Sequence, residues 1–128
     1  MAKNVRGVED LIKSRSRAYP KSAYRDKDGR TLQRLARYLK QDIEQAQKAR
    51  GWAMRGLKYA RKMRTAHKAD IQQGKIDAND PLFGTAALDD EVRYYALMAK
   101  YELYKTTSAK KSLANLNEVR RDRGLKIR

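Results

Sequence analysis

A long stripe of apolar and small side chains runs through the middle of the chain. Between residues 32 and 71 these side chains recur every three or four positions, with a mean spacing of about 3.5 residues. This spacing is typical of helices that pack side by side as coiled coils. Thr31 is a candidate N-cap and Gly74 is placed to end a helix, so the pattern predicts a helix over residues 31–73. The predicted inward positions are Leu32, Leu35, Leu39, Ile43, Ala46, Ala49, Ala53, Leu57, Ala60, Met63, His67 and Ile71.

A second stripe of the same kind follows a short polar connector. Thr85 is its candidate N-cap and Gly124 is placed to end it. Two long helices joined by a short connector pack as an antiparallel hairpin. We therefore predict an all-α fold, a long antiparallel helical hairpin over about residues 31–73 and 85–123. The second set of inward positions is Leu88, Val92, Ala96, Ala99, Leu103, Thr106, Ala109, Leu113, Leu116 and Val119.

The connector determines which residues of the two helices lie level. Centring it near Asn79 predicts that residues face each other when their numbers sum to about 158. Small residues such as Ala53 would then face small residues near Thr106. Leu82 and Phe83 are placed to close the end of the hairpin.

Residues 1–30 are predicted to form a basic N-terminal arm, and residues 31–128 the hairpin domain. The arm has room for one short amphipathic helix around Leu11 and Ile12. Tyr19-Pro20 ends any such helix, because the residue before a proline is pushed out of the α region.

Charge is the clearest functional signal. The 128 residues include 31 Lys and Arg against 15 Asp and Glu, a net charge of +16. The stretch from Arg50 to Lys68 has no acidic residue, and cations spaced along a helix suit the phosphates of a nucleic acid. A merely solvated face and a membrane-surface helix, the latter suggested by Trp52, are the alternatives. The predicted nucleic-acid-binding residues are Arg50, Arg55, Lys58, Arg61, Lys62, Arg64 and Lys68.

A second apolar stripe lies beside the inward positions of the later helix. A helix with two apolar faces contacts more than one neighbour. The neighbour is either the N-terminal arm folded back or another subunit, with base stacking as a third interpretation. The predicted partner interface comprises Trp52, Tyr59, Tyr94, Leu97, Tyr101 and Tyr104.

Several classes of site are excluded by composition. The chain has no Cys and one His, and it has no glycine-rich phosphate loop or metal-ligand spacing, so we expect no catalytic residue, metal or cofactor. His67 lies on the first stripe and is expected to be structural. Asp89, Asp90 and Glu91 are expected to complement the positive end of the second helix.

Leu, Ile, Val and Phe together make up only about 17% of the chain, so the hairpin has a thin core and is expected to need a partner. Without a signal peptide or membrane span, we expect it in the cytoplasm or within a virion. In composition and helix length alone, the chain is similar to minor structural proteins of tailed-phage particles, which surround the portal or are ejected with the DNA. With the second apolar stripe and the acid-free stretch, we therefore expect a non-enzymatic assembly subunit. It would contact nucleic acid, expected to be DNA, and copies of itself or other subunits. A free-standing nucleic-acid-binding protein, nucleoid- or RNA-associated, and a membrane-interacting helical protein are the alternatives.

Overall fold

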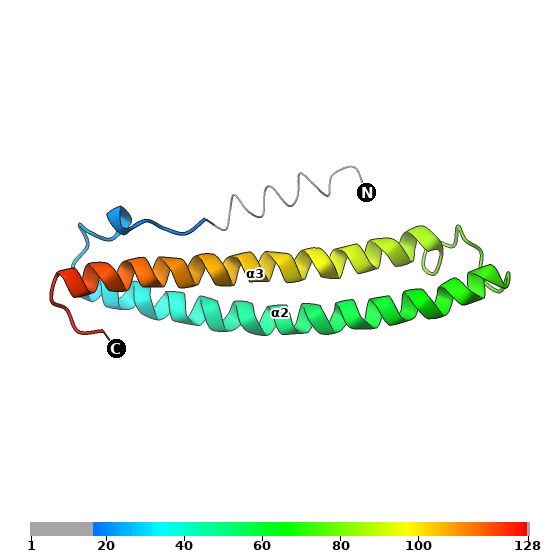
Figure 1. The fold of residues 1–128 in the computed structure, drawn as a ribbon, viewed down its shortest axis with the longest axis horizontal. Helices are drawn as coiled ribbons and strands as arrows, with labels where there is room; N and C mark the ends of the chain where they lie inside the picture. Colours follow the sequence, from blue (N-terminus) through cyan, green and yellow to red (C-terminus); the bar gives the residue numbers. More distant parts are fainter. Residues whose placement is uncertain (1–16, 128) are drawn as a thin grey trace.

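Two long antiparallel helices dominate the computed structural model, which describes residues 17–127. Helix α2 spans Gly29–Gln72 and helix α3 spans Thr85–Asp122. The helices lie side by side along their length (Figure 1). The predicted all-α hairpin is therefore confirmed. The short helix expected around Leu11 lies outside the described residues.

Local capping explains where the helices begin and end. Asp28, not Thr31, caps α2: its carboxylate accepts a hydrogen bond from the Thr31 amide at 2.7 Å, so α2 begins two residues earlier than predicted. A hydrogen bond from the Thr31 side chain, and after it this one from the Thr31 amide, lower the pKa of Asp28. Gly84, not Thr85, occupies the N-cap of α3. The predicted stops are confirmed, since Gly74 and Gly124 adopt φ of +75° and +70° directly after the two helices.

The core is concentrated in two places. One cluster of buried side chains lies where the start of α2 packs against the end of α3 and includes Leu32 and Leu116, both fully buried. A second cluster comprises Leu57, Ala60 and Val92. Between the clusters only small side chains are buried, so the middle of the rod gains little from hydrophobic burial. These small side chains are Ala46, Ala53, Ala99, Thr106, Ala109 and Ser112.

The predicted inward positions are confirmed with one exception. All twelve positions on α2 are buried or half-buried. On α3, Leu103 is 42% exposed. Its neighbour Glu102 is half-buried, with one carboxylate oxygen fully shielded. At this level α2 offers only alanines such as Ala49 and Ala53, which are too short to cover a leucine at the edge of the interface.

The register differs from the prediction. Gly56 lies against Tyr95, and Arg64 against Asp89, so level residues have numbers that sum to about 152 rather than 158. Helix α2 therefore extends beyond the first turn of α3, as the right-hand end of Figure 1 shows.

The connector causes this shift by folding back along α2. The Asp80 carboxylate accepts hydrogen bonds from the amides of Leu82 and Phe83, at 2.9 and 2.8 Å, and these lower its pKa. Phe83 then packs on His67, with ring centroids 5.1 Å apart. Phe83, although 46% exposed, thus covers the half-buried His67 ring at the end of the hairpin. Leu82 does not help to close it, because it is 72% exposed.

The described part of the arm packs on α3. The Tyr19 amide donates to Ser112 Oγ at 2.9 Å. Lys21, the first residue of the short 3-10 helix η2 (Lys21–Ala23), pairs with Glu118 at 2.7 Å. Tyr24 is buried, which raises its pKa against the opposing effect of its hydrogen bond with Ser112. This segment thus covers the C-terminal half of α3.

Candidate nucleic-acid interface and aromatic surface

The acid-free stretch of α2 presents five cations to solvent. Their side chains are exposed, and within residues 17–127 none of them forms an ion pair. The nearest acidic residues of α2 lie outside the stretch: Glu44, which pairs with Lys48, precedes it, and Asp70, beside His67, follows it. We call these five residues the basic surface: Arg55, Lys58, Arg61, Lys62 and Lys68.

The basic surface contains two rows along the helix. Arg61 and Lys68 are seven residues apart, and so are Arg55 and Lys62, so each pair lies on one side of α2, about 10 Å apart. Lys58 lies between the rows. The whole set spans about 20 Å of a continuous helix, which holds the cations at fixed spacing.

The other two predicted cations are tied into the hairpin. Arg64 Nη1 lies 3.5 Å from Asp89 Oδ1, which links α2 to α3. Arg50 is half-buried, and its Nε is shielded from solvent without a hydrogen-bond partner. Five of the seven predicted residues therefore lie together on the exposed side, whereas Arg50 and Arg64 do not.

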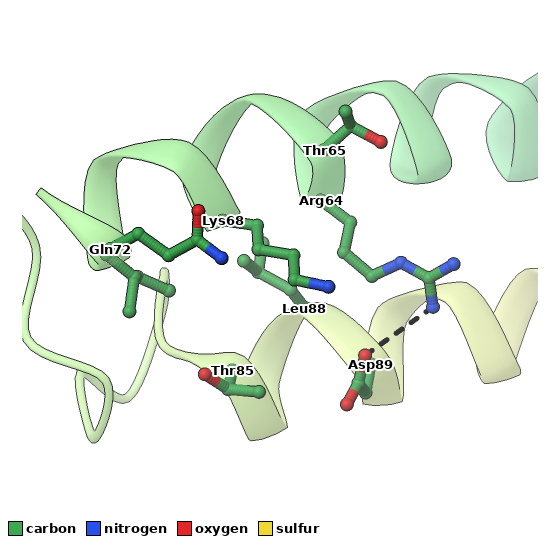
Figure 2. A pocket seen from close by; sticks show the side chains of 8 residues that line it. Arg64, Thr65, Lys68, Gln72, Thr85, Leu88 and Asp89 are labelled. Atoms are coloured by element: carbon green, nitrogen blue, oxygen red, sulfur yellow. Dashed lines mark hydrogen bonds and ion pairs between the residues drawn. The ribbon is translucent and has the colours of Figure 1, made fainter.

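A groove of about 610 Å³ extends the basic surface towards the connector (Figure 2). The Lys68 ammonium points into the space between the helices, above Leu88, and the Arg64 guanidinium points towards Asp89. Gln72 and Thr85 also line the groove. Sequence reasoning missed these two because the unexpected register brings the end of α2 beside the start of α3.

Asp89 and its acidic neighbours do not act as predicted. The first turn of α3 contains no acidic residue, and the macrodipole effect fades beyond that turn. Asp89 instead faces Arg64, and Asp90 faces Arg93 at 3.8 Å. The side-chain pairing, not the helix end, accounts for both carboxylates.

Exposed aromatic rings gather on a neighbouring side of the hairpin, which shares Arg55 with the basic surface because Arg55 lies between Trp52 and Tyr59 along α2. Trp52 packs edge-on against Tyr95, with centroids 6.3 Å apart, and Tyr95 against Tyr94 at 5.3 Å. Trp52 remains 56% exposed and Tyr94 57%. Seven residues beyond each, Tyr59 and Tyr101 are also exposed and lie on the same side of their helices. With half-buried Met98, these residues form what we call the aromatic surface: Trp52, Tyr59, Tyr94, Tyr95, Met98 and Tyr101.

The remaining predicted interface residues, Leu97 and Tyr104, are half-buried on α3. The described arm contacts Ser112, Asn115 and Glu118, which lie beyond Tyr104. Residues 17–28 therefore leave the aromatic surface uncovered.

The part of the chain that the structure describes contains no group of three or more histidine or acidic side chains that could hold a metal ion. No helix between residues 17 and 127 is both long and apolar enough to cross a membrane. Comparisons with protein-family models, with curated proteins and with solved structures give no match.

Proposed function

We propose that this chain is a non-enzymatic structural subunit of a nucleoprotein assembly and that its basic surface contacts nucleic-acid phosphates without reading sequence. The observation that carries the proposal is the set of five exposed cations on one stretch of helix, none of which has an ion-pair partner among residues 17–127. A tailed-phage particle, with the protein near the portal, inside the particle or ejected with the DNA, is the setting that we propose.

The spacing of the cations suits a duplex. DNA rises about 3.4 Å per base pair, so a stretch of about 20 Å spans roughly six pairs. Arginine and lysine contacts to phosphates position a protein on the backbone but carry no sequence information. With five such contacts, the logarithm of the association constant for DNA should fall linearly with the logarithm of the salt concentration, with a slope of about −4.5.

The proposal is tested by removing three charges from the basic surface. In the triple variant Arg61→Gln, Lys62→Gln, Lys68→Gln, we expect DNA affinity to fall at least tenfold and the slope to shrink to about −1.8. All three side chains are exposed, so helicity measured by circular dichroism should not change.

A matched control removes three exposed lysines elsewhere: Lys110→Gln, Lys111→Gln and Lys126→Gln. It has the same net charge as the test variant and should keep most of the wild-type slope. If both variants lose the same DNA affinity, net charge alone drives binding. If the salt slope of the test variant is unchanged, phosphates bind elsewhere on the protein. Tighter binding to anionic vesicles than to DNA would favour a membrane role instead.

A further inference from the structure

The middle of the hairpin has its small side chains inside and large apolar ones outside. The two helices meet there through residues such as Ala53 and Ala99, whereas Trp52 and Tyr101 face outwards on the aromatic surface. Contiguous exposed apolar surface of this kind marks an interaction site. A partner on this side would supply the burial that the hairpin lacks between its two core clusters.

We propose that the partner is a second copy of this chain, packed antiparallel through the aromatic surface about a two-fold axis at Met98. The result is a four-helix bundle with an isologous interface, in which the same surface is used by both copies. This inference rests on the assembly half of the proposed function but not on nucleic-acid binding.

The charges on either side of Met98 match this symmetry. Glu91 and Lys105 lie seven residues before and after Met98, two turns or about 10 Å away, and therefore on the same side of α3. A two-fold axis at Met98 places Glu91 of one copy level with Lys105 of the partner subunit, and the reverse. Within residues 17–127 neither side chain forms an ion pair of its own. Two complementary charge pairs would thus frame an apolar centre, as in many interfaces.

The position of the axis also favours extensive overlap. In the observed register Met98 is level with residue 54, close to the middle of α2. Antiparallel copies crossing there overlap along nearly the whole rod. Large aromatic side chains bury about 150–250 Å² each, so the exposed parts of Trp52, Tyr59, Tyr94 and Tyr101 offer roughly 400 Å² per copy. This is about half of the 800 Å² per partner typical of a stable interface, and the flanking polar residues would supply the rest.

The aromatic surface leaves the row of Arg61 and Lys68 free for phosphate contacts. It includes the side of α2 that carries Arg55, which lies three residues after Trp52 and four before Tyr59. Trp52 and Arg61 are nine residues apart, or two and a half turns, so they point to opposite sides of α2. The same holds for Tyr59 and Lys68. Dimerisation would leave Arg61, and the groove that Lys68 lines, outside the interface on both copies.

The test is a charge swap followed by sedimentation equilibrium of the full chain without nucleic acid. We expect the wild type to dimerise, and Glu91→Lys or Lys105→Glu alone to weaken the dimer about tenfold or more, because each places like charges together twice. The double variant Glu91→Lys, Lys105→Glu should recover most of the affinity. The two residues are about 21 Å apart along one helix, so recovery cannot arise within a single copy.

Lys110→Glu serves as the control. It makes the same charge change as Lys105→Glu, but at an exposed position towards the other edge of α3, and should leave the dimer intact. A wild-type monomer at about 0.5 mM, or a double variant as weak as the single ones, would overturn the inference. A monomer in which Trp52 is shielded from acrylamide would assign the surface to another part of the same chain. Because no basic-surface residue is changed, the salt slope for DNA reports separately on the proposed function.

Discussion

The contact between Gly56 and Tyr95 gives a quantitative test of the packing. An ideal Cβ on Gly56 would lie 2.5 Å from Cδ1 of Tyr95 and closer still to Cε1. Replacing glycine with alanine inside a helix normally stabilises it by about 1 kcal/mol. At Gly56 the added methyl group must displace the ring, and overpacking of this kind costs about 1–3 kcal/mol. We therefore expect Gly56→Ala to lie between neutral and about 2 kcal/mol destabilising.

Gly51→Ala is the matched control on the same helix. A Cβ there would meet only the Arg55 guanidinium, at 3.8 Å, so the full gain of about 1 kcal/mol should appear. Removing the ring with Tyr95→Ala should also turn Gly56→Ala into a stabilising change. The measurement is urea unfolding followed by circular dichroism at one chain concentration, because self-association would shift the midpoint. Equal stabilisation by Gly51→Ala and Gly56→Ala would refute the close contact and the register that it defines.

Three further predictions concern the core, the caps and the basic surface. Leu116→Ala should lower the free energy of unfolding by about 2–5 kcal/mol in urea titrations, because Leu116 is fully buried in the terminal cluster. Hydrogen bonds lower the pKa values of Asp28 and Asp80 in the folded state, so their stabilising contributions are complete above the unfolded value of 3.8 and disappear as the pH falls below it. The urea midpoint should therefore drop as the pH falls from about 5 through the lowered pKa values, and a variant with asparagine at both positions should lose less. Asp89→Asn should release Arg64 for a sixth phosphate contact and steepen the salt slope for DNA by about 0.9, whereas an unchanged slope would show that Arg64 is misplaced for binding.

The two helices could be predicted because their pattern is local. The inward positions of α2 follow from a spacing of three or four residues, and all of them are buried or half-buried. The stops at Gly74 and Gly124 were also readable, since both glycines adopt the left-handed conformation that other residues avoid. The caps were harder to place, because Asp28 and Thr31 are both good capping residues and only the hydrogen bond decides between them.

The register could not be predicted because it depends on how the connector folds. The sequence around Pro81 indicates a turn but not that the chain returns along the last turns of α2. That path requires the Asp80 carboxylate to accept hydrogen bonds from two backbone amides. It also requires glycine at position 84, where a Cβ would meet the backbone oxygens of Asp80 and Ala78. Hydrophobic periodicity carries no information about these contacts, because they lie within the connector between the two helices.

The same connector decides what Arg64 does, which is why the candidate site was only partly predictable. The basic run is continuous in sequence, so its location on one helix needs no tertiary information. Which of its members stay unpaired depends on the partner helix. If level residues summed to about 158, Arg64 would lie opposite Tyr94 and Asp89 opposite Ala69, and the cation would be free for phosphate. In the observed register Arg64 meets Asp89 and holds the helices together. A shift of six in this sum therefore changes Arg64 from a candidate phosphate-binding residue into one member of a structural ion pair. The residues of the basic surface stay exposed in either register.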